Sequence, residues 1–136
     1  MNPLILYQNT QLELQETKNT LAMRGISLSK EDILSLQQTI LFICKKLHWI
    51  ETDHSKLNQI LAPFLNSPYM STNNYLDILK NLIISYYEVR SRYHRFVEDT
   101  MILDAMEMIY IKRGGTLDIY YVEKVLHQVQ RMRGTK

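Results

Sequence analysis

Apolar residues recur at helical spacing along most of the chain, and the clearest run lies between Thr72 and Phe96. One face of this run carries Tyr75, Leu79, Leu82, Tyr86, Val89, Tyr93 and Phe96. The spacing of i, i+3, i+4 and i+7 predicts an amphipathic helix with a wide apolar face. Its length of roughly 36 Å exceeds the radius of gyration of about 14 Å for a compact chain of this size. We therefore expect a long central helix at about residues 72–96, capped by the Thr72 hydroxyl, with the remaining helices packed around it.

Two residues of the predicted central helix depart from its pattern. Ile84 lies on the polar face, where it is a candidate for an outward contact. Arg90 lies within the apolar face, where its guanidinium can either extend to water along the aliphatic stem or pair with a buried carboxylate. The candidate partners for such a buried pair are Asp104 and Glu107.

Three shorter helices are expected before the central one. The first spans about 11–24 and has few apolar residues, so it should lie at the periphery. The second begins at Ser29, which forms a capping-box pattern with Asp32. The third should lose its regular hydrogen-bond ladder near Ala62, because Pro63 has no amide hydrogen.

A fifth helix is expected, with Asp99 as its cap and its end at about Lys112. Its composition is unusual. Apolar residues point in nearly every direction around its axis, and only Asp104 and Glu107 form a narrow polar strip. A helix that is apolar all round is normally buried on most sides. In so small a protein, this helix must either run through the centre of the bundle or meet another subunit. The candidate interface residues are Ile84, Met106 and Tyr110.

Gly114 and Gly115 form the strongest break in the chain. A final helix should follow, with Thr116 as its N-cap, and residues 133–136 should fray at its end. The prediction is an all-α fold, a single-domain bundle of five to six helices that covers residues 1–136.

Composition adds limits to this picture. The chain has 136 residues, 46% of them hydrophobic and 22% charged, which is ordinary for one globular domain. The net charge of +2 is small and the charges are well mixed, whereas nucleic-acid-binding proteins usually carry a marked basic stripe. The single Cys44 favours a reducing compartment. No signal peptide or spanning segment is recognisable, so we expect a soluble, cytoplasmic protein without membrane contact.

The sequence contains no catalytic pattern that we can assign. Glu51-x-x-His54 has the spacing of a di-iron half-site, but a second such pair is absent. Neither a nucleophile elbow nor a phosphate-binding glycine loop occurs. We therefore expect a protein that is not an enzyme and uses no cofactor or metal.

Two alternative functions remain open. The Arg90–Arg95 stretch interleaves basic and aromatic residues, as single-strand nucleic-acid binders do, although Tyr93 should face the core. The polar strip of Asp104 and Glu107, with a neighbouring tyrosine, could instead bind a small molecule in a cavity of the bundle.

Several short motifs resemble those of a known family. They are Gly25-x-x-Leu28, Ile50-Glu51, Phe64-x-x-Ser67-Pro68-Tyr69, Tyr75 and the Tyr86-Tyr87 pair. Together they are similar to an uncharacterised family of small bacterial helical proteins, a domain of unknown function, over about residues 21–117. The resemblance implies a helical fold and no established activity. Our leading hypothesis is a helical protein-interaction or regulatory protein that can associate with itself or with another protein.

Overall fold

The structure is a computed structural model that describes residues 3–51, 56–93 and 97–134, with side chains for 12–51, 56–93 and 97–128. The described chain is all helical and contains no strand, which confirms the predicted fold class. Its elements are α1 (Pro3–Ala22), α2 (Lys30–Lys46), α3 (Lys56–Leu61), the 3₁₀ turn η1 (Ala62–Phe64), α4 (Tyr75–Tyr93), α5 (Asp99–Lys112) and α6 (Ile119–Gly134). None of the described helices is long and apolar enough to cross a lipid bilayer.

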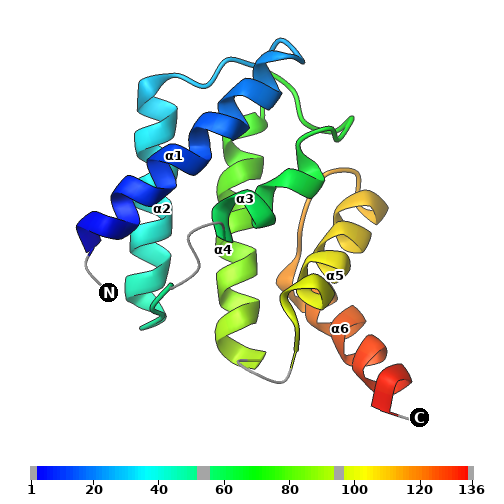
Figure 1. The fold of residues 1–136 in the computed structure, drawn as a ribbon. Helices are drawn as coiled ribbons and strands as arrows, with labels where there is room; N and C mark the ends of the chain where they lie inside the picture. Colours follow the sequence, from blue (N-terminus) through cyan, green and yellow to red (C-terminus); the bar gives the residue numbers. More distant parts are fainter. Residues whose placement is uncertain (1–2, 52–55, 94–96, 135–136) are drawn as a thin grey trace.

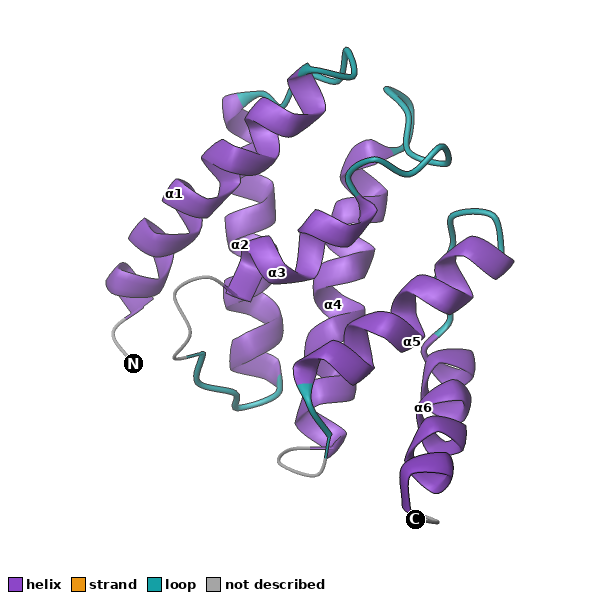
Figure 2. Ribbon diagram, turned by 45° about the vertical axis from the view of Figure 1, so that its right-hand side comes forward, coloured by secondary structure: helices purple, strands orange, loops and turns teal. Residues whose placement is uncertain are grey.

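Helix α4 lies at the centre of the bundle, as its periodicity predicted. It packs against α2, α3, α5 and α6. Figure 1 shows α4 between the α1–α2 pair on one side and α5 with α6 on the other. The turned view in Figure 2 shows α3 crossing in front of α4, and α1 at the left edge of the bundle.

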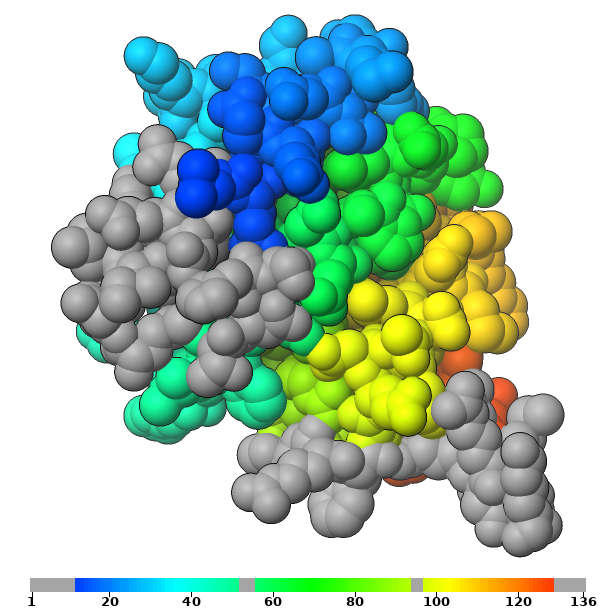
Figure 3. All heavy atoms as spheres, in the orientation of Figure 1, coloured from blue at the N-terminus to red at the C-terminus, as the bar shows by residue number. Residues whose placement is uncertain are grey.

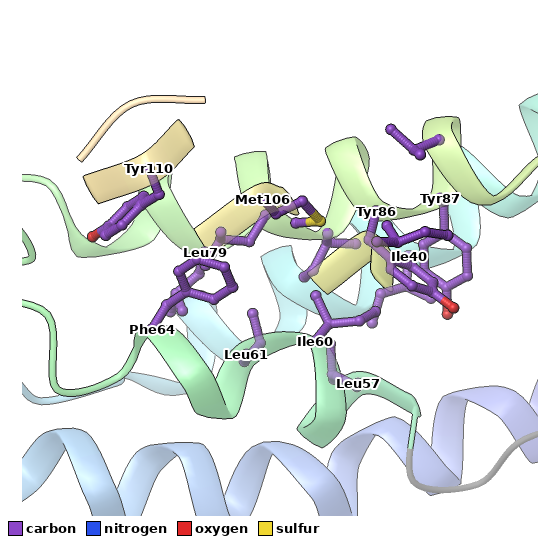
Figure 4. Close-up of a cluster of buried hydrophobic side chains, with 14 of the residues drawn as sticks. Ile40, Leu57, Ile60, Leu61, Phe64, Leu79, Tyr86, Tyr87, Met106 and Tyr110 are labelled. Atoms are coloured by element: carbon purple, nitrogen blue, oxygen red, sulfur yellow. The ribbon is translucent and has the colours of Figure 1, made fainter. Parts of the chain in front are cut away.

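The core forms where these helices meet, and Figure 4 shows part of it. Leu57, Ile60, Leu61 and Phe64 from α3 and η1 point toward Leu79 and the two tyrosines of α4. Met106 and Tyr110 enter from α5 and are 0% and 2% exposed. Burial of large side chains contributes about 1.5–3 kcal/mol each, so this cluster is the main source of stability.

Local signals in the sequence located several helix ends correctly. The capping box at α2 is present: Asp32 N donates to Ser29 Oγ at 3.1 Å and Ser29 N donates to Asp32 Oδ2 at 3.0 Å. Helix α3 ends at Leu61 and continues as the 3₁₀ turn around Pro63, because proline cannot donate to the α-helical ladder.

The predicted start of α1 was wrong, and its buried face is larger than its composition indicated. The helix begins at Pro3, where a proline in the first turn is a start signal. Leu14, Thr17 and Leu21 are fully buried against α2 and α3, although the helix is outermost in the bundle.

Two other predicted caps were also wrong. The central helix begins at Tyr75, after a turn over 72–74 in which the Asn74 side chain bonds Ser71 N at 2.7 Å and Tyr69 O at 3.0 Å. Thr72 is therefore not its cap.

The cap of α6 is Asp118, since its Oδ1 accepts from Tyr120 N at 2.9 Å, whereas Thr116 Oγ1 donates to Arg113 O. Residues 133–134 are helical, so the predicted fraying does not begin there, and 135–136 lie outside the described residues.

Candidate binding site

A buried polar cluster joins α3, α4 and the start of α5. Arg90 is 7% exposed, and its guanidinium donates to Asp99 Oδ1 at 2.8 Å and to Val97 O at 2.7 Å. The Lys56 ammonium pairs with the other carboxylate oxygen of Asp99. The Tyr86 hydroxyl donates to Oδ1 at 2.7 Å. The Asp99 carboxylate thus forms ion pairs with two cations and accepts a hydrogen bond from a phenol.

The electrostatics of this cluster follow from its burial. Burial raises the pKa of Asp99, but hydrogen bonds from Lys56, Tyr86 and Arg90 outweigh it, and the net pKa is lowered. Burial and the Asp99 carboxylate raise the pKa of the Tyr86 hydroxyl. Arg90 Nε is buried without a hydrogen-bond partner, but the charges pair with one another inside the protein. We therefore assign this cluster a structural role: it fixes the starts of α3 and α5 on α4.

The predicted partner of Arg90 was wrong. Arg90 does not extend to water, and neither Asp104 nor Glu107 pairs with it. Asp104 is exposed and Glu107 is half-buried. Asp99 was interpreted as a helix cap, but the N-cap residue of α5 is Glu98, which makes no side-chain cap bond. The Asp99 side chain is therefore free to turn toward α4.

The predicted interface residues were also mostly wrong. Met106 and Tyr110 face the core, and Ile84 is half-buried against it. The large apolar residues that α5 turns outward are Met108 and Ile111, which are 57% and 56% exposed. Helix α5 is therefore buried on one side, against α4 and α6, and carries an apolar strip on the other.

A surface pocket lies beside this strip, between α5 and the loop of residues 65–70. The loop is held by the turn that follows α1, because the Arg24 guanidinium donates to Leu65 O, to Ser67 O at 2.8 Å and to Met70 O at 3.2 Å. The loop also packs closely on Gly115, which has a φ of +101°. A Cβ atom at Gly115 would lie 2.5 Å from Tyr69 Cβ. Figure 3 shows this green loop region beside the yellow and orange end of α5.

The pocket has a volume of about 180 Å³. Its walls are Pro63, Phe64, Asn66, Ser67, Pro68, Tyr69, Glu107, Tyr110 and Ile111. Tyr110 packs edge-to-face on Phe64, with ring centroids 5.1 Å apart and planes at 76°. Tyr69 packs on Tyr110 in the same way, at 5.9 Å and 75°. Aromatic walls thus meet at nearly right angles.

Hydroxyl groups lie beside these rings. Ser67 Oγ and Tyr110 Oη are 2.8 Å apart, and Ser67 Oγ also accepts from Tyr69 N at 3.1 Å. The two hydroxyls carry two hydrogens, of which their mutual bond uses one. Burial raises the pKa of Tyr110, so its hydroxyl stays protonated at neutral pH. One O–H group of this pair therefore remains as a donor for a ligand.

Glu107 supplies the charge of the pocket. It is half-buried, and no hydrogen bond or ion pair joins it to another residue of the part of the chain that the structure describes. No lining residue is basic. The small-molecule site was predicted in a cavity of the bundle, whereas this pocket lies at the surface. Glu107 and Tyr110 line it, and the exposed Asp104 does not.

The other predicted sites are not assembled in the described structure. Arg92 pairs with Glu123 on α6. The Tyr93 hydroxyl shares a 2.8 Å hydrogen bond with His127 Nε2. With Arg90 buried, the basic surface of the nucleic-acid hypothesis is reduced, and its residues 94–96 lie outside the described residues.

The structure describes only part of the Glu51-x-x-His54 motif. His54 lies outside the described residues, and Glu51 is buried and accepts from the Tyr87 hydroxyl at 2.7 Å. Among the residues whose side chains are described, no group of three or more His, Cys, Asp or Glu residues could hold a metal ion.

These features define an all-α bundle protein with a small acidic and aromatic pocket beside an apolar helix face. The chain belongs to a family of unknown function (DUF6323), whose model matches residues 13–135. This agrees with the resemblance of its motifs to a domain of unknown function. No curated protein and no solved structure is significantly similar to the chain.

Proposed function

We propose that the protein is a non-enzymatic interaction protein that associates with a second copy of itself through the outward face of α5. The observation that carries this proposal is the strip of Met108 and Ile111, two large apolar side chains more than half exposed and one turn apart. Tyr69, 37% exposed, extends the apolar surface across the pocket. Contiguous apolar surface marks an interaction site more than apolar residues scattered singly do.

Charge is compatible with a second copy as the occupant. The same helix carries Asp104 and Glu107 on one side of the strip and the exposed Lys112 near its end. A face with both signs of charge does not repel itself, as a single-sign face would. A two-fold interface uses the same patch on both chains. The outward face of α5 would therefore be buried on each of the two copies.

The location of the protein is part of this proposal. Cys44 is a free, buried thiol, which is compatible with a reducing compartment. We therefore keep the cytoplasm as the proposed location and a second copy as the proposed partner.

Sedimentation velocity over a series of protein concentrations tests the proposal. The wild-type chain should show a reversible dimer in the micromolar range, and Met108→Asp should shift it to monomer, because a carboxylate in an apolar interface is desolvated without a partner. The matched control is Phe42→Asp, which changes an apolar side chain that is 64% exposed on α2. A wild-type monomer at every concentration, or equal effects of the two variants, would overturn the proposal.

A further inference from the structure

We infer that the pocket between α5 and the 65–70 loop binds an alkylammonium cation. This inference goes beyond self-association and does not depend on it. The pocket combines a carboxylate and aromatic walls, which both favour an alkylammonium group, with one spare hydroxyl donor, which can bond an acceptor elsewhere on the ligand.

The charge of the pocket lining indicates the charge of its ligand. Glu107 is the only charged residue that lines the pocket, and it has no ion-pair partner among the residues described. Arg24 lies near enough to lower the pKa of Tyr110, but it does not line the pocket and its guanidinium is occupied by loop carbonyls. A cation therefore gains an attractive partner in the pocket, whereas an anion would face an unpaired carboxylate.

The aromatic walls determine the chemical class of that cation. Phe64, Tyr69 and Tyr110 line the pocket. Phe64 and Tyr110 are 1% and 2% exposed, so Tyr69, which is 37% exposed, offers a ligand most of the aromatic surface. The π-face of an aromatic ring attracts cations, and arrangements of several rings bind ammonium groups that carry alkyl substituents. The alkyl part would contact Ile111 and the prolines, while the charged head would lie toward Glu107.

The size of the pocket limits the ligand to a small group. A water molecule occupies about 30 Å³ in the liquid, so a volume of about 180 Å³ holds about six groups of that size. This matches the head of a small amine or the end of a lysine side chain. A hydroxyl or carbonyl on the ligand could also bond the Ser67–Tyr110 pair or the Asn66 amide.

Titrations followed by amide chemical shifts in a ¹H–¹⁵N spectrum test this inference. The probes are choline, a capped lysine peptide and dimethylbutanol, the neutral carbon isostere of choline. The two cations should shift the amides of Ser67, Tyr69 and Glu107, and the neutral isostere should not. The tighter of the two cations identifies the source of the ammonium group. Equal binding of the isostere and choline, or shifts confined to other surfaces, would overturn the inference.

Variants of two pocket residues sharpen the test. Glu107→Gln should weaken choline binding about two- to fivefold, as expected for a partly exposed ion pair. Tyr69→Leu, which keeps the Cβ that contacts Gly115, should weaken it about two- to thirtyfold by removing a ring. The matched control is Asp104→Asn, an exposed carboxylate one turn away that does not line the pocket. Equal effects of Glu107→Gln and Asp104→Asn would contradict the inference.

The two proposals share Ile111 and Tyr69, which belong to the proposed dimer surface and also line the pocket, whereas Met108 belongs to the dimer surface alone. The Met108→Asp chain should therefore bind choline at least as well as the wild-type chain does. If Met108→Asp abolished both dimerisation and choline binding, the pocket would require the second copy and the inference as stated would be wrong.

Discussion

Replacing Asp99 by asparagine should be one of the most destabilising single-atom changes in this protein. The amide keeps the shape of the carboxylate but removes its charge, while the Arg90 and Lys56 side chains remain 8% and 9% exposed. Arg90 would then lack the carboxylate that it bonds, and Lys56 would lose its ion pair with Asp99. Breaking a fully buried pair costs about 3–5 kcal/mol. Because the Asp99 side chain is 30% exposed, water screens part of the loss, and we expect about 2–3 kcal/mol.

Urea unfolding followed by far-ultraviolet circular dichroism measures this loss directly. A chain of this length should also lose about 10 °C in Tm for such a change. The control is Asp104→Asn, an exposed carboxylate on the same helix, which should stay within about 0.5 kcal/mol of the wild type. Equal stabilities of the two variants would refute the structural role of the cluster.

The pH dependence gives an independent check on the same carboxylate. The folded-state pKa of Asp99 is lowered, so its contribution is fully present above the unfolded value of about 4 and is lost as pH falls through the folded value. The stability difference between wild type and Asp99→Asn should therefore shrink as the pH is lowered below about 4. A difference that stays constant down to strong acid would contradict the assignment.

Two further predictions concern other parts of the fold. Gly115→Ala should lower the free energy of unfolding by more than about 2 kcal/mol, because positive φ and a collision with Tyr69 act together. Gly114→Ala, with open space around it, should lower it by about 1 kcal/mol. Equal melting temperatures of the two variants would contradict this. Burial, with a smaller contribution from Glu51, raises the pKa of Cys44 to about 12. Iodoacetamide at neutral pH should therefore label this thiol only when urea unfolds the chain, and rapid labelling of the folded protein would show that the site is open.

The sequence predicted those features that depend on neighbours along the chain. The Ser29–Asp32 capping box and the end of α3 at Pro63 both follow from spacings of a few residues. The central position of α4 also follows, because a long helix with a wide apolar face must be covered by other helices.

Features that depend on contacts distant in sequence were not predictable in this way. The partner of Arg90 is set by how α5 meets α4, and Asp99 has the same local pattern as an ordinary helix cap. A helix that is apolar all round gives no preferred face, so its periodicity could not distinguish the buried Met106 from the exposed Met108. The same limit explains the incorrect interface residues.

The pocket was predictable only in part. Glu107 and a tyrosine one turn away could be named from the spacing on α5. The opposite wall is a loop held by Arg24, whose bonds to Ser67 and Met70 span more than 40 residues. No local pattern in the sequence indicates that this loop would lie against α5.

Cysteine cross-linking across the dimer tests most directly whether two copies meet at α5. In a two-fold interface a residue near the axis faces its own counterpart, and the buried Cys44 does not compete for oxidation. We expect Met108→Cys to form a covalent dimer readily under mild oxidation, while Phe42→Cys, on the exposed face of α2, stays monomeric. Covalent dimers that form no faster from Met108→Cys than from Phe42→Cys would contradict the proposed interface.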